Sequence, residues 1–152
     1  MCIRDRLKGP HLFWEKEWKL INKESYCERI VPLVDGWLRM NPYLKFMQDG
    51  APGHSAAYTQ EQLLERDIRP IFWPAYSPDL NPIEAVWNKM KNYIEINYPD
   101  RDGGKQPTYD QLRQIVQEAW ESITVEQLRG LIDSMHDRCQ AVIDAQGGHT
   151  KY

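Results

Sequence analysis

The chain has 152 residues, of which 41% are hydrophobic and 27% charged, and it includes six Trp and eight Tyr. This length fits one domain, and so many large aromatic side chains favour a packed core over disorder. The formal net charge of −3 argues against a protein whose main role is to coat nucleic acid, because such domains usually carry a basic surplus. No apolar run approaches the roughly 20 residues that a membrane span needs.

The cysteines and the first residues bear on compartment and completeness. Cys2, Cys27 and Cys139 form no Cys-x-x-Cys pair, which disfavours a zinc knuckle and fits reduced thiols inside a cell. The opening residues lack the apolar region of a signal peptide, and their back-translation resembles a sequencing-adaptor end. We expect residues 1–8 to be an artefactual leader and natural sequence upstream of it to be missing.

The first half of the chain predicts helices and two strands. Apolar residues at helical spacing between 25 and 40 predict a helix, which Pro32 should kink or start later. The apolar runs 43–48 and 68–73 predict strands, and residues 55–66 between them predict a helix. Strand, helix and strand within about 30 residues form a βαβ unit, so we expect a parallel pair.

A strong helix start follows the proline-rich segment 73–82. Asn81 suits the N-cap, Pro82 suits the first helical position, and Glu84 is an acid in the first turn. Apolar residues at helical spacing predict the buried face of this helix: Ile83, Val86, Trp87, Met90 and Ile94. Three tryptophans should contribute to the core: Trp73, Trp87 and Trp120.

Two further capping-box patterns predict helices near the end of the chain. Thr108 pairs with Gln111 and Thr124 pairs with Gln127, each before a run of apolar residues at helical spacing. We expect these two helices to form an antiparallel hairpin that covers the sheet.

Two acids stand out by their positions. Asp49 follows the predicted strand 43–48, at the sheet edge where ligands of open α/β folds collect. Glu84 lies in the first turn of its helix, and 34 residues (50–83) separate the two acids. Paired carboxylates at one edge suit a hard cation such as Mg²⁺. The alternative is purely structural, because Asp before Gly is a common turn former and Glu at the third helical position is a common capping partner.

The residues around these acids resemble a known family. Residues 48–54 (QDGAPGH) and 73–87 (WPAYSPDLNPIEAVW) resemble the two signature blocks of mariner-like DDE transposases, and residues 139–152 resemble the end of such a protein. In this family the first block carries the second catalytic Asp, and the second block carries the catalytic Glu. The resemblance therefore implies that Asp49 and Glu84 are catalytic and bind metal.

The resemblance also implies a fold. Family members have an α/β, ribonuclease-H-like fold, with a mixed sheet between two layers of helices. Their first three strands are antiparallel and carry the first catalytic Asp, and no acid before Asp49 lies in a convincing strand here. We therefore expect residues 9–152 to be the C-terminal part of the catalytic domain, truncated at the N-terminus and ending in the helical hairpin.

The implied activity is DNA strand cleavage and transfer in cut-and-paste transposition, assisted by two Mg²⁺ or Mn²⁺ ions. The implied partners are transposon-end and target DNA, with a homodimer as an option for the full-length form, and the expected location is the nucleus. Because two carboxylates would leave one metal underligated, we expect the chain to be inactive alone. A decayed, non-catalytic remnant with at most weak DNA binding is the alternative, and a ribonuclease-H-like nuclease acting on RNA would share the fold.

Three other residues are candidates for contact with DNA. His54 could touch a phosphate, or could order the Asp49 loop through a plain hydrogen bond. Lys89 and Lys91 lie on the helix of Glu84, where they could contact the DNA backbone or remain ordinary solvated lysines.

Overall fold

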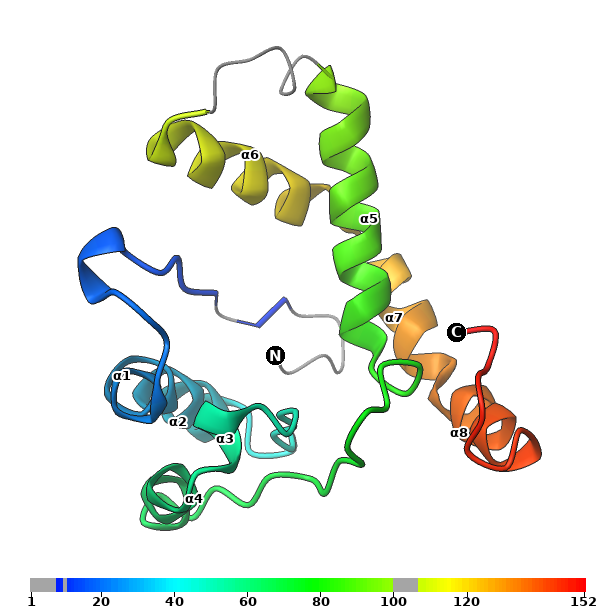
Figure 1. Cartoon of the computed structure of the whole chain (residues 1–152), viewed down its shortest axis with the longest axis horizontal. Coiled ribbons are helices and arrows are strands. Elements are labelled where there is room, and N and C mark those ends of the chain that lie inside the picture. Colours follow the sequence, from blue (N-terminus) through cyan, green and yellow to red (C-terminus); the bar gives the residue numbers. More distant parts are fainter. Residues whose placement is uncertain (1–7, 10, 100–106) are drawn as a thin grey trace. The chain divides into compact units, whose positions relative to one another are not determined.

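The computed structural model describes residues 8–9, 11–99 and 107–152, which fall into two compact units, Met1–Ser77 and Pro78–Tyr152 (Figure 1). Except for Lys8, the expected leader at residues 1–8 lies outside the described residues. Every regular element in the described ranges is a helix. None of these helices combines the length and the apolar character required to cross a membrane.

The first unit is built around helix α1. Its elements are the 3-10 helix η1 and four α-helices: η1 Lys16–Trp18, α1 Lys23–Arg29, α2 Val31–Met40, α3 Pro52–Ser55 and α4 Ala57–Leu64. Helix α1 packs against α2, α3 and α4 (Figure 1). The buried core joins these helices to the segments that follow α2 and α4, and consists of Tyr26, Cys27, Val31, Phe46, Leu63 and Ile68.

The first predicted helix is divided into α1 and α2. Asn22 is the N-cap of α1, since its side chain accepts a hydrogen bond from the Ser25 amide at 2.8 Å and its own amide donates to Ser25 Oγ. Helix α2 begins after Ile30 and carries Pro32 in its first turn, where a missing N–H costs no hydrogen bond. The prediction that Pro32 shifts a helix start is therefore confirmed.

The two predicted strands are not strands in the described residues. Segments 43–48 and 68–73 are joined by a backbone hydrogen bond of 2.8 Å from Ile71 to Phe46, but no ladder forms. Two strands alone are marginally stable, because a sheet usually needs a third strand or a covering layer. Ile71 and Phe72 in the second segment are exposed, so no layer covers them in the described residues. The βαβ prediction is wrong to this extent.

The second unit is built on helix α5. Its helices are α5 Pro82–Asn97, α6 Tyr109–Ser122, α7 Val125–Asp133 and α8 Met135–Asp144. Helices α6 and α7 each pack against α5, and α8 packs against α7 (Figure 1). The predicted caps of α5, α6 and α7 are confirmed, because Asn81, Thr108 and Thr124 each accept a backbone hydrogen bond from the first turn.

The predicted helical hairpin requires a correction. The second of its two helices ends at Asp133, and a new helix, α8, begins after Ser134. The Ser134 hydroxyl donates to the Leu131 carbonyl at 2.7 Å, which is the kind of local bond through which serine competes with a continuous helix. The main partner of both α6 and α7 is α5, so the two helices are not a hairpin packed on itself.

The burial of the three tryptophans predicted to lie in the core differs from one to the next. Trp120 is buried and Trp73 is half-buried, but Trp87 is 41% exposed. The buried stripe of α5 follows a spacing of four residues through Val86, Met90 and Ile94. Trp87 is one position beyond Val86, which turns it about 100° around the helix and out of the stripe.

The contact between α5 and α6 predicts a pH dependence of stability. The Tyr98 hydroxyl donates to the Glu118 carboxylate, and this bond, with a second from Gln114, holds the pKa of Glu118 below its ordinary value of 4.5. Because the folded-state pKa is depressed, this stabilisation is present above 4.5 and is lost as the pH falls through the folded-state value. We expect Tyr98→Phe to raise the pKa of Glu118 in an NMR titration. We also expect the melting temperature of the variant to fall less than that of the wild type as the pH is lowered through that range. Tyr58→Phe, at an exposed site of α4, is the control, and an unchanged Glu118 titration in Tyr98→Phe would contradict the assignment.

Candidate catalytic centre

Asp49 is held at the start of a tight loop. Its Oδ1 atom accepts a hydrogen bond of 3.1 Å from the Ala51 amide and lies 2.6 Å from Nδ1 of His54. Both contacts end on Oδ1, and the side chain is 58% exposed. Oδ2 therefore has no hydrogen-bond partner among the described contacts, so it can accept a ligand.

His54 is fixed in turn by α1 and α4. Its ring lies against the Tyr26 ring, with 4.5 Å between the ring centroids. Its carbonyl accepts hydrogen bonds from the side-chain amides of Gln48 at 3.2 Å and Gln60 at 2.8 Å. The hydrogen bond expected between His54 and the Asp49 loop is therefore present. That His54 orders the loop, and that it contacts a phosphate, stay predictions.

The electrostatics of the loop keep Asp49 ionised. Partial burial acts to raise its pKa, but the hydrogen bonds from Ala51 and His54 outweigh burial and hold the pKa below its ordinary range. Burial, followed by the nearby Cys27 and Asp49, raises the pKa of Tyr26 to about 12, so the hydroxyl that donates to Gln48 stays protonated. The loop therefore presents a carboxylate at neutral pH.

Glu84 is presented by the start of α5. The side chain of Asn81 accepts from the Ile83 amide at 3.3 Å, and its carbonyl accepts from the Glu84 amide at 3.1 Å. The Asn81 amide donates to the Pro78 carbonyl at 2.9 Å, so Glu84 does not act as the capping partner of Asn81. Within the described residues no hydrogen bond or ion pair engages the exposed Glu84 carboxylate. Its oxygens can accept a ligand.

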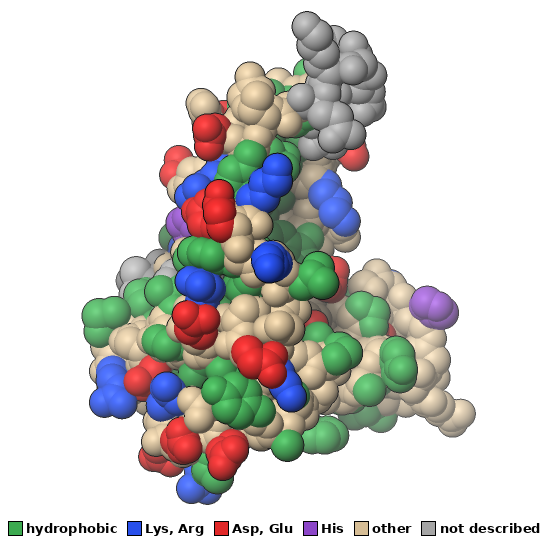
Figure 2. Space-filling view, turned by 60° about the vertical axis from the view of Figure 1, so that its left-hand side comes forward, with side chains coloured by type: hydrophobic (Ala, Val, Ile, Leu, Met, Phe, Trp, Pro, Cys, Tyr) green, Lys and Arg blue, Asp and Glu red, His purple; other side chains and the backbone are tan. Residues whose placement is uncertain are grey.

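The two acids belong to different units, Asp49 to the first and Glu84 to the second, and each is described within its own unit. The described residues contain no group of three His, Cys, Asp or Glu side chains that could hold a metal ion. Lys89 and Lys91 are exposed on α5, and their contact with DNA stays a prediction. On the face in Figure 2, Lys and Arg side chains alternate with Asp and Glu rather than forming one basic patch.

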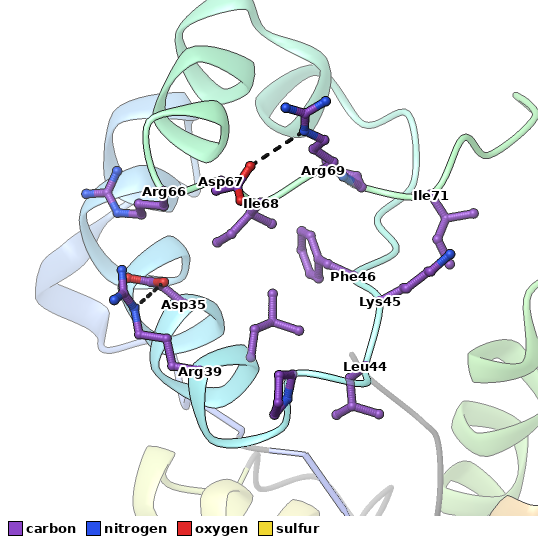
Figure 3. A pocket seen from close by; sticks show the side chains of 13 residues that line it. Asp35, Arg39, Leu44, Lys45, Phe46, Arg66, Asp67, Ile68, Arg69 and Ile71 are labelled. Carbon is purple, nitrogen blue, oxygen red and sulfur yellow. Dashed lines mark hydrogen bonds and ion pairs between the residues drawn. The ribbon is translucent and has the colours of Figure 1, made fainter.

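A hollow in the first unit is separate from the Asp49 loop. It lies between α2, residues 44–46 and residues 66–71 (Figure 3). Asp49 follows the end of segment 43–48 and is not among the lining residues. Two of its arginines are paired, Arg39 with Asp35 at 2.8 Å and Arg69 with Asp67 at 3.6 Å. Sequence reasoning did not find this hollow, because its lining comes from separate segments that carry no common motif.

Comparison with known proteins places both acids in a matched region. Residues 38–102 match the DDE superfamily endonuclease family. The Tcb1 transposase of Caenorhabditis briggsae is 35% identical over 153 residues, which cover 99% of this chain and 52% of the relative. The Tc1 transposase of Caenorhabditis elegans is 36% identical over 107 residues, which cover 70% of this chain and 37% of the relative. The chain is therefore similar to Tc1/mariner transposases along nearly its whole length.

The chain spans about half or less of these Tc1/mariner relatives. Among solved structures, the Mos1 transposase catalytic domain with raltegravir and Mg matches with a TM-score of 0.64 and 18% identity, covering 88% of this chain and 67% of that chain. The Mos1 mariner paired end complex with Mn matches with the same TM-score and 19% identity, covering 39% of its chain. The fold of this chain is therefore similar to that of part of the Mos1 catalytic domain, although the described residues form no regular strands.

The contacts of His54 give a test of the Asp49 loop. We expect His54→Ala to reduce the free energy of unfolding by about 1 kcal/mol, because it removes a charge-assisted hydrogen bond at a partly exposed site. Urea unfolding measures the loss, and amide exchange of Gly50, Ala51 and Gly53 should become faster. His136→Ala, at an exposed site of α8, is the control. Equal stability and exchange in the two variants would show that His54 does not hold the loop.

Proposed function

We propose that Asp49 and Glu84 are two of the carboxylates that hold divalent cations in a DDE transposase, an enzyme that cuts and joins DNA strands in cut-and-paste transposition. The observation that carries this proposal is that both acids lie in the matched endonuclease region and offer carboxylate oxygens that the described residues leave unengaged. The structural alternative accounts for only part of this pattern: Asp49 does form its turn, but Glu84 does not cap its helix.

The residues present fit a hard cation. Carboxylate oxygens are the ligands that Mg²⁺ and Mn²⁺ prefer, and the Asp49 loop keeps its carboxylate ionised. Bound ions would activate the attacking oxygen and stabilise the leaving oxygen. In this proposal the chain itself supplies fixed donors: His54 orients Asp49, and the Asn81 cap presents Glu84. The solved Mos1 relatives that contain Mg or Mn support the choice of ions.

The proposed substrate is DNA, at transposon ends and target sites, and the nucleus is the proposed location. Lys89 and Lys91 project from the same helix as Glu84 and are the proposed contacts with the DNA backbone. With a net charge of −3 and mixed charges on the face in Figure 2, we expect the chain alone to bind DNA weakly. In the full-length form, separate domains would deliver the catalytic domain to DNA, and two copies could act together.

Metal binding tests the proposal directly. We expect the chain to bind Mn²⁺ weakly, and Asp49→Asn and Glu84→Gln each to weaken binding at least about tenfold, because even the loss of an outer-shell partner of a metal ligand has an effect of about that size. The electron paramagnetic resonance signal of unbound Mn²⁺ gives the affinity. Glu95→Gln is the matched control, since this residue is exposed on the same helix as Glu84. Binding that survives Asp49→Asn unchanged would show that the ion sits elsewhere.

The same ion can test whether the two acids share a site. Metal–oxygen bonds of about 2 Å require the two carboxylates to lie within about 10 Å of each other. Substoichiometric Mn²⁺ should therefore broaden the amide resonances of residues 50–51 and 83–85 together. Broadening confined to one of these segments would refute a shared site.

Strand cleavage tests whether the chain acts by itself. Two carboxylates leave part of the metal shell to water, and phosphoryl transfer depends on positioning and charge stabilisation. We therefore expect the 152-residue chain to leave supercoiled plasmid intact with Mg²⁺ or Mn²⁺. Metal-dependent nicking that disappears in Glu84→Gln would overturn this expectation of inactivity while supporting Glu84 as a metal ligand.

A further inference from the structure

Arg138 of α8 is a buried charge in the second unit. The residue is 6% exposed, and no carboxylate in the described part of the chain pairs with it. Its Nε donates to Ser134 Oγ at 3.0 Å, its Nη1 donates to the Asp79 carbonyl at 2.6 Å, and its guanidinium lies 4.5 Å from the centre of the Tyr152 ring. A buried charge is costly unless it is hydrogen-bonded, so these contacts hold Arg138 in one place.

Asp79 is held on two sides by distant parts of the chain. Its carbonyl accepts the bond from Arg138, and its Oδ2 accepts a bond of 3.1 Å from the Thr150 hydroxyl. The Tyr152 amide donates to Thr150 Oγ1 at 3.3 Å, which ties the last residues together. Residues 150–152 therefore fold back onto the turn that contains Asp79.

This turn leads directly into the helix of Glu84. The Asn81 amide bonds to the Pro78 carbonyl across the turn, and the Asn81 side chain caps the first turn of α5. The fully buried apolar contacts of α5 begin at Val86, beyond Glu84. Packing thus fixes the body of the helix, whereas the direction of its first turn depends on the residues before it.

We propose that Arg138, Thr150 and Tyr152 form a C-terminal latch that positions Glu84 for metal binding by holding Asp79. The latch touches no reacting group, so its members are positioning residues. It rests on the proposed function, because it matters for chemistry only if Glu84 is a metal ligand. Opening the latch leaves α5 folded but lets its first turn move, which lowers the affinity of the metal site.

The experiment compares Thr150→Val, which removes the hydroxyl at nearly constant volume, with Thr150→Ser, which keeps it. Mn²⁺ affinity of the whole chain is measured by electron paramagnetic resonance. We expect Thr150→Val to bind Mn²⁺ about fivefold more weakly, which is the change in affinity that corresponds to the free energy of one hydrogen bond. Thr150→Ser should bind as wild type. His149→Ala, an exposed neighbour, is the control and should bind as wild type. Tyr152→Leu is the second variant and should shift affinity in the same direction, which keeps the test decisive if Thr150→Val unfolds.

Combination with Glu84→Gln separates positioning from general destabilisation. If the latch acts through Glu84, Thr150→Val weakens Mn²⁺ binding in the wild-type chain but adds nothing in the Glu84→Gln background. An equal loss in both backgrounds, or no loss in the wild-type chain, overturns the latch. If Glu84→Gln alone binds Mn²⁺ with wild-type affinity, Glu84 is not a metal ligand and the proposed function fails. This outcome differs from the two that overturn the latch, so the two failures are distinguished.

Discussion

The cap at Asn81 is the interaction on which the second unit depends. Asn81 is 9% exposed; its side chain accepts a hydrogen bond from the Ile83 amide, and its backbone amide donates to the Pro78 carbonyl. Because the cap is complete without Glu84, the acid in the first turn keeps its oxygens for another partner. The same cap sets where α5 begins, and therefore where its buried stripe faces α6 and α7. One local bond thus links the packing of the unit to the presentation of its acid.

Prediction from the sequence succeeded where the determinants are local. The caps at Asn81, Thr108 and Thr124, and the shifted start at Pro32, depend on residues within one helical turn, which a pattern can register. Strands depend on neighbours that are distant in sequence, and segments 43–48 and 68–73 provide each other with too few hydrogen bonds for a ladder. The break at Ser134 was missed for a related reason, because serine is compatible with both a helix and its end.

In the candidate site, too, local features could be predicted from the sequence and long-range contacts could not. Asp49 and Glu84 were found from two contiguous blocks, and the bond between Asp49 and His54 spans only five residues. The contacts of Asp79 with Arg138 and Thr150 span 59 and 71 residues, and nothing in either segment indicates the other. Arg138 looks like an ordinary surface residue of a polar helix until its burial is known. Such long-range polar contacts are what sequence reasoning leaves out most easily.

The bond between Asp49 and His54 also gives the acid a structural role that does not depend on chemistry. A chain that must fold loses this hydrogen bond when either partner changes, whether or not it acts on DNA. An intact Asp49 is therefore explained by folding as well as by the metal binding that we propose for it, so the presence of this acid alone does not show that a related sequence is active.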